Sequence, residues 1–150
     1  MINVVVDTTV FRNDPARKKA AFQTIKKLAS AGELKLHIPQ IVKQEFLSQQ
    51  IDQYHASLSE ILKNLLVFTK KNIPEDARKL LKTQEKQLSN LKEELFTFAK
   101  REFEQWILDI GAEVHPISES HGPKVMEAYF SGDPPFREKK SRLDIPDAFI

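Results

Sequence analysis

The sequence predicts an α/β fold in which a parallel sheet is flanked by helices and a long helical hairpin is inserted. Two observations predict this class. The first 38 residues contain an apolar strand signal, a helix signal and a second strand signal, and a strand–helix–strand unit of this length forms a right-handed crossover in a parallel sheet. The chain then keeps helical periodicity from about Pro39 to about Gly111, which is long enough for two helices.

Three local signals predict the strand–helix–strand unit at the start of the chain. Ile2–Val6 is a β-branched run without polar alternation, as is typical of a buried parallel strand. Asp14 and Pro15 resemble an N-cap followed by proline at the first helical position, so we expect a helix there that ends at Gly32. The segment Glu33–Ile38 alternates between apolar and polar residues, which predicts the second strand.

The middle of the chain predicts an antiparallel helical hairpin. One helix is expected to begin at Pro39 and end near Asn72, and a second to begin at Pro74 and end near Gly111. The second helix carries a narrow apolar seam that recurs mainly every seven residues. The seam consists of Leu81, Leu88, Leu91, Leu95 and Phe98.

The last forty residues predict a third strand, a short helix and an abrupt end. Ala112–Ile117 is strand-like, and Gly122–Phe130 is expected to form a helix. A further helix is expected to start near Asp144, so the chain would stop about one turn into it at Ile150. We therefore expect a truncated chain, in which residues 137–150 are poorly ordered or are held by another copy of the chain or by a partner.

Composition excludes several classes of protein. The chain has 150 residues, no cysteine, 41% hydrophobic and 29% charged residues, which is an ordinary globular mixture that predicts a single domain over residues 1–150. Disulfides, thiolate metal sites and cysteine nucleophiles are excluded, and a cytoplasmic location is expected. The N-terminus lacks a basic region, so it is not a signal peptide, and no membrane segment is predicted. The net charge of +2 is too small to indicate nucleic acid by itself.

Three acidic residues occupy positions that share one edge of the predicted sheet. Asp7 ends the first strand, Glu45 lies in the first turns of the helix after the second strand, and Asp147 lies in the first turn of the last helix. The carboxyl ends of parallel strands and the N-termini of the following helices meet at the edge where such folds bind ligands. Three carboxylates that converge there would repel one another unless a cation lay between them, and Mg²⁺ or Mn²⁺ prefers such ligands.

The same residues lie in three motifs that resemble those of the PIN-domain ribonucleases. VVVDTTVF resembles the opening strand of that family, IPQIVKQEF resembles its proline-led helix with a metal-site glutamate, and DIPDAFI resembles its later helix that begins with aspartate. The order and approximate spacing agree with the family. The long helical segment between the second and third motifs is similar to the insertion of a larger PIN-like subgroup.

The resemblance implies a metal-dependent ribonuclease. Asp7, Glu45 and Asp147 would be the catalytic residues, either as ligands of Mg²⁺ or Mn²⁺ or as residues that hold metal-bound water, and Thr8 or Thr9 would support Asp7 by hydrogen bonding. The metal would activate a water molecule to attack the RNA phosphodiester in line and would stabilise the leaving oxygen. The family adds a further acidic residue from a later strand, which would follow Ile150, so weak or absent activity is expected of this chain.

Each of these residues also has a structural interpretation. Asp7 could end a strand in a turn, and Glu45 could be a solvated helix residue. Asp144 as an N-cap and Asp147 three positions later would form an acidic variant of the capping box, and both would favour the helix dipole. Asp144 is therefore expected to support the site as a cap rather than to bind metal.

A basic run near the C-terminus is expected to contact RNA phosphates without reading sequence, with a solvated loop as the alternative. The run consists of Arg137, Lys139, Lys140 and Arg142. The histidines show no ligand spacing and are interpreted as structural or surface residues. They are His37, His55, His115 and His121. Trp106 and the phenylalanines at helical spacing are interpreted as core.

Two other functions remain open. The chain could be an inactive PIN-like scaffold whose helical hairpin binds a protein partner, including an antitoxin, and a homo-oligomer is also possible. An aspartyl-phosphate phosphotransferase shares a strand that ends in aspartate. That class requires a second aspartate two residues further on, where this chain has Thr9, so this function ranks last.

Overall fold

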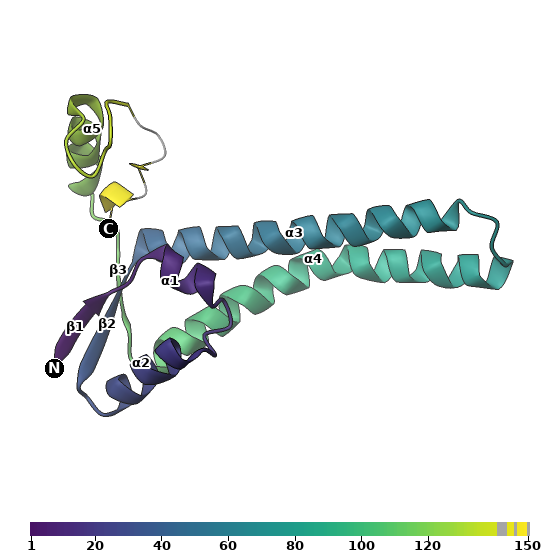
Figure 1. The fold of residues 1–150 in the computed structure, drawn as a ribbon, viewed down its shortest axis with the longest axis horizontal. Coiled ribbons are helices and arrows are strands. Elements are labelled where there is room, and N and C mark those ends of the chain that lie inside the picture. The colour runs from purple at the N-terminus through teal and green to yellow at the C-terminus, as the bar shows by residue number, and fades with distance from the viewer. Residues whose placement is uncertain (141–143, 146, 150) are drawn as a thin grey trace. The chain divides into compact units, whose positions relative to one another are not determined.

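A computed structural model of the chain describes residues 1–140, 144–145 and 147–149 (Figure 1). The elements follow one another as β1 (Ile2–Val5), α1 (Thr8–Asn13), α2 (Ala20–Ser30), β2 (Leu34–Pro39), α3 (Gln40–Thr69), α4 (Glu75–Asp109), β3 (Glu113–His115), α5 (His121–Ser131) and the 3₁₀ helix η2 (Asp147–Phe149). The chain divides into two compact units, residues 1–46 with 106–150 and residues 47–105. No helix among the described residues is long and apolar enough to span a membrane.

The sheet of the first unit is parallel, with strand order β1-β2-β3. Val4 pairs with Leu36 and Ile38 pairs with Val114. Side chains alternate across a strand, and in β2 the residues Leu34, Leu36 and Ile38 are buried while Lys35 and His37 are partly exposed. The predicted α/β class with a parallel sheet, flanking helices and a long helical hairpin is confirmed.

An aromatic cluster forms the centre of this unit. The ring of Phe11, which is fully buried, lies 5.6 Å from Phe22, 5.3 Å from Phe46 and 5.7 Å from Trp106, measured between ring centroids. The guanidinium of Arg17 lies 5.5 Å from the centroid of the Trp106 ring. These contacts join α1, α2 and the first turns of α3 to the end of α4.

The prediction that a helix begins at Asp14 and Pro15 is wrong. A short helix, α1, precedes this point, and Asp14 is its C-cap. The buried carboxylate of Asp14 accepts a hydrogen bond of 2.6 Å from the backbone N–H of Lys19. It therefore closes the turn between α1 and α2, and α2 begins at Ala20. Gly32, with φ of +72°, ends the following turn as expected.

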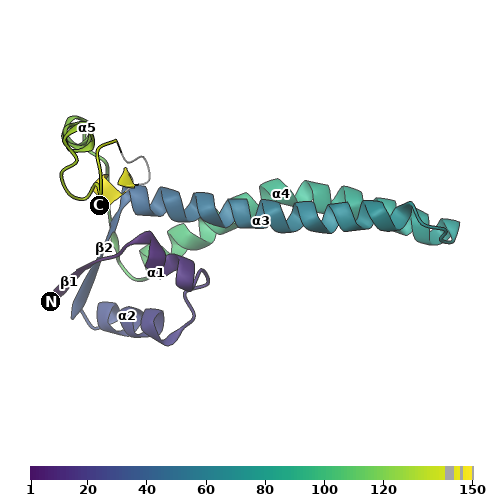
Figure 2. The same ribbon diagram turned by 45° about the horizontal axis from the view of Figure 1, so that its top comes forward.

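The second unit contains parts of α3 and α4, which run antiparallel and side by side in both views (Figures 1 and 2). The facing residues of α4 are partly buried at the predicted spacing, and they include Leu81, Leu88, Leu91 and Leu95. On α3 the residues Ile51, Leu58 and Leu65 are partly buried at a matching seven-residue spacing. The predicted hairpin is confirmed, whereas the assignment of Phe98 to its seam is wrong, because that side chain is 47% exposed.

Candidate functional site

Asp7 lies where β1 ends and α1 begins. The backbone N–H of Val6 donates to the carbonyl of His37 at 3.3 Å, which extends the pairing with β2 up to Asp7. Asp7 is the N-cap of α1 with an extended backbone, and its carbonyl accepts from Val10 N–H. Its exposed carboxylate makes no capping hydrogen bond. The Asp7 side chain therefore lies at the carboxyl edge of the sheet and does not cap the helix that follows.

Glu45 is connected to the residue that follows Asp7. It lies in the second turn of α3, a helix that buries Val42 and Phe46 on either side of it. The hydroxyl of Thr8 donates a hydrogen bond of 2.6 Å to Glu45 Oε2. The resemblance implies that Thr8 or Thr9 supports Asp7, and of these two residues Thr8 donates its hydroxyl to Glu45 instead. The contact joins the end of β1 to the start of α3 at one edge.

Replacing Thr8 by Val is expected to lower the free energy of unfolding by about 1–2 kcal/mol, because a part-buried hydrogen bond to a carboxylate is lost while the shape of the side chain is kept. Thr9→Val is the matched control. Thr9 is exposed one residue further along α1, so this change should stay within about 0.5 kcal/mol. Chemical denaturation of both variants measures the difference. Equal stabilities of the two would contradict a stabilising role for the Thr8–Glu45 contact.

Asp147 begins η2 and is exposed. Asp144 is buried, its Oδ2 accepts a hydrogen bond of 3.1 Å from Arg137 N–H, and its Oδ1 lies 3.8 Å from Arg137 Nε. Asp144 thus ties together residues 137 and 144. A cap at Asp144 would accept from the backbone N–H of Asp147, because residue 146 is a proline without an N–H, and the described helix η2 begins only at Asp147. Residue 146, Arg142 and part of the 137–150 segment for which poor order is predicted lie outside the described residues.

A pocket of about 350 Å³ lies at the carboxyl ends of the three strands. Its lining comprises Val5, His37, Pro39, Gln40, His115, Pro116, Ile117, His121 and Phe149. Val5, Gln40 and Phe149 come from the same three segments as Asp7, Glu45 and Asp147. The end of β1, the start of α3 and η2 therefore share one pocket, although the three carboxylates are absent from its lining.

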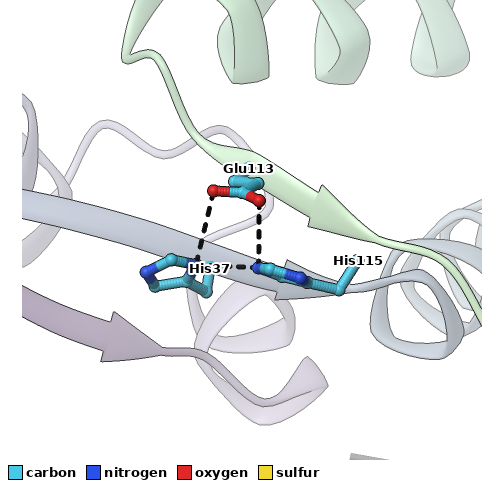
Figure 3. A group of neighbouring side chains, drawn as sticks. All are labelled: His37, Glu113 and His115. Atoms are coloured by element: carbon cyan, nitrogen blue, oxygen red, sulfur yellow. Dashed lines mark hydrogen bonds and ion pairs between the residues drawn. The ribbon is translucent and has the colours of Figure 1, made fainter.

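A second group of polar side chains lies on the partly exposed face of the sheet (Figure 3). His37 Nδ1 and His115 Nε2 share a hydrogen bond of 2.7 Å, and each lies 4.0 Å from an oxygen of Glu113. Lys35 Nζ contacts Glu113 Oε2 at 2.5 Å. The hydrogen bond from Lys35, together with its charge, lowers the pKa of Glu113 below its usual range.

Sequence reasoning missed this group. Among the described residues, His37, Glu113 and His115 form a set of possible metal ligands whose ligand atoms all lie within 4.8 Å of one another. The structure does not bring Asp7, Glu45 and Asp147 into such a set, so their joint binding of a cation stays a prediction. The available signal was the spacing of polar residues two apart in both strands, which places their side chains on one face.

The predicted phosphate contacts lie beside α5. Arg137, Lys139 and Lys140 are exposed. The backbone N–H of Lys140 donates to the carbonyl of Tyr129 at 2.8 Å, which folds this segment back onto α5. Their exposure leaves these cations accessible to a polyanion, and their binding role stays a prediction.

Comparison with known protein families gives one match. The family model described as PIN domain matches residues 4–150, which is nearly the whole chain and includes all three acidic positions. The family has a nuclease-type fold and generally uses divalent metal ions. Neither the curated proteins nor the solved structures contain a significant match. The extent of the family match, with which the parallel α/β sheet is consistent, shows that this chain belongs to the PIN domain family.

Proposed function

We propose that the chain is a ribonuclease that hydrolyses RNA phosphodiester bonds with Mg²⁺ or Mn²⁺ held at the carboxyl edge of the sheet. The observation that carries this proposal is the Thr8–Glu45 hydrogen bond of 2.6 Å. It holds the Glu45 carboxylate beside the strand end that carries Asp7. Two acidic residues from distant parts of the sequence thereby reach the edge at which parallel α/β folds bind ligands.

The residues at this edge fit a hard divalent cation. Asp7, Glu45 and Asp147 offer carboxylate oxygens, which are the ligands that Mg²⁺ and Mn²⁺ prefer. The Asp7 carboxylate is exposed and makes no capping hydrogen bond, and the Glu45 carboxylate is oriented by Thr8. When bound, such an ion lowers the pKa of a coordinated water and stabilises charge on the leaving oxygen.

The protein's own residues supply the positioning. Thr8 holds one oxygen of Glu45, so that carboxylate keeps its orientation when substrate arrives. Arg137, Lys139 and Lys140 would contact the RNA backbone, which provides affinity without sequence preference. The absence of cysteine favours the reducing cytoplasm as the compartment in which this reaction takes place.

Incubation of the protein with end-labelled single-stranded RNA tests the activity. We expect slow cleavage in Mn²⁺ and in Mg²⁺ and none in EDTA, with products that carry the same terminal chemistry at every position. Because the RNA contacts are electrostatic, cleavage should fall steeply as salt is raised. Absence of cleavage in both metals at low salt, with a protein shown to be folded, would contradict the proposal.

A second function is favoured by one specific observation. Leu66, Val67 and Phe68 near the end of α3 are 44%, 54% and 49% exposed, and consecutive exposed apolar residues often mark a binding surface. A scaffold that binds a protein partner through this hairpin, as an antitoxin would, accounts for them. A folded chain without metal-dependent cleavage at any salt concentration would favour this function over the ribonuclease.

A further inference from the structure

The group on the open face of the sheet has the composition of a transition-metal site. His37 comes from β2, while Glu113 and His115 come from β3. His37 is paired with Glu113 in the sheet register, so the backbone ladder holds the three side chains together. Figure 3 shows the carboxylate of Glu113 facing both rings. Ligands that are fixed by regular strands lose little conformational entropy on binding.

An outer residue orients the first histidine. Asn3 from β1 lies beside His37, with Asn3 Oδ1 2.9 Å from His37 Nε2. Because an amide oxygen only accepts hydrogen bonds, this contact is made by the tautomer of His37 that carries its proton on Nε2. Nδ1 then presents its lone pair toward His115 and Glu113. Histidines that bind metals usually donate their other ring N–H to an oxygen in this way.

A cation would bind between His37 Nδ1 and His115 Nε2, where the two rings now share a hydrogen bond. With His37 Nδ1 as acceptor, the 2.7 Å contact requires His115 Nε2 to donate a proton. A cation between the two nitrogens would replace this proton, which would move to Nδ1 of the neutral His115 ring. Tetrahedral coordination at about 2.0–2.1 Å would place the nitrogens about 3.3 Å apart. The side chains of His115 and Glu113 are 47% and 45% exposed, so they have room for this adjustment.

We propose that His37 Nδ1, His115 Nε2 and a carboxylate oxygen of Glu113 form a binding site for a Zn²⁺-class transition-metal ion. Two imidazoles and one carboxylate favour Zn²⁺ over Mg²⁺, which prefers oxygen ligands. Three protein ligands leave a fourth position open. His37 and His115 also line the pocket of about 350 Å³, so a small anion or water in that pocket can complete the coordination.

Lys35 competes with the cation for Glu113. Its Nζ lies 2.5 Å from Glu113 Oε2, so it occupies one carboxylate oxygen and places a positive charge near the site. Removing this charge should strengthen metal binding, whereas loss of either histidine should weaken it. These opposite signs separate a metal site from a purely structural network, in which all three changes would only alter stability.

Calorimetric titration of Zn²⁺ into the full chain, prepared without a histidine tag, tests the proposal. We expect one equivalent of Zn²⁺ to bind to the wild type, and His37→Gln or His115→Gln to weaken that binding by at least about 100-fold, the upper value for outer-shell changes. Co²⁺ should give the intense visible bands of a low-symmetry site in the wild type, and these bands should be lost in His37→Gln and His115→Gln. His55→Gln on α3 is the matched control and should bind Zn²⁺ as the wild type does.

Two further variants sharpen the test. Lys35→Met is expected to tighten Zn²⁺ binding, and Asn3→Ala is expected to weaken it by about 10-fold, as for other outer-shell partners. Thermal unfolding without metal confirms that each variant is folded. No stoichiometric Zn²⁺ binding, or equal losses in His55→Gln and His37→Gln, would overturn the proposal. The ribonuclease proposal rests on other residues and other metals, so neither outcome decides it.

Discussion

Replacing Asp7 by Asn is expected to lower Mn²⁺-dependent RNA cleavage by about 100-fold or more, or to the EDTA background. Replacing a residue that hydrogen-bonds to a metal ligand typically lowers metal affinity or activity by about 10–100-fold. Asp7 is proposed to be a direct ligand, so we expect a loss at the upper end of this range or beyond it. The change keeps the size of the side chain but removes its negative charge. Single-turnover cleavage of labelled RNA, with enzyme in excess, measures the rate.

Asp52→Asn provides the control for this experiment. Asp52 is an exposed acid on α3 that is not among the proposed metal ligands, so its replacement makes the same change in net charge without removing one of them. We expect its cleavage rate to match the wild type within about twofold, which corresponds to roughly 0.4 kcal/mol. Equal rates for the Asp7→Asn variant and the wild type would remove Asp7 from the proposed site.

Replacing Phe11 by Ala is expected to lower the free energy of unfolding by about 3–5 kcal/mol, the usual cost of deleting a buried aromatic ring. Phe11 is fully buried and contacts Phe22, Phe46 and Trp106. Its loss would leave a cavity among three large side chains. Because a domain is stable by only about 5–15 kcal/mol, the variant should be close to unfolding at room temperature.

Urea denaturation of Phe11→Ala beside Phe96→Ala measures this effect. Phe96 is 45% exposed on α4, so the same truncation there should cost about 1 kcal/mol or less. Similar losses in the two variants would show that the aromatic cluster does not form the centre of the unit.

Local patterns were sufficient to predict most of the elements. The alternation before Pro39 identifies a strand because a strand places successive side chains on opposite faces, and the β-branched composition of the N-terminal run identifies another. The prediction that this first strand is buried is wrong, because β1 lies at the edge of the sheet and Ile2 and Val5 are 63% and 60% exposed. The two long helices follow from sustained periodicity and from the prolines that precede them. Gly32 ends the turn after α2 because its φ of +72° is readily adopted only by glycine.

The start of the chain shows where local patterns fail. Asp14 and Pro15 have the composition of a helix start, but the chain forms a turn there. The helix α1 has six residues, which is too short to be stable alone. It is stabilised by the packing of Phe11 against residues from α2, α3 and α4. Such contacts join distant parts of the sequence, so no local signal reveals them.

The histidine–glutamate group was missed for a related reason. His37 and His115 are 78 positions apart in the sequence, and their contact depends on which strands are neighbours and in what register. The position of Asp7 and Glu45 at one edge was predictable because every parallel sheet places strand ends and helix starts together. The hydrogen bond from Thr8 to Glu45 could not be predicted, because it depends on the rotation of α3 about its own axis.

A crystal structure of the protein with Mn²⁺, using anomalous scattering to locate the ion, tests the central claim most directly. We expect an anomalous peak at the carboxyl edge of the sheet, within coordination distance of the carboxylates of Asp7, Glu45 and Asp147, with Thr8 still hydrogen-bonded to Glu45. A structure saturated with Mn²⁺ that shows no peak there, with the three carboxylates directed away from one another, would contradict it.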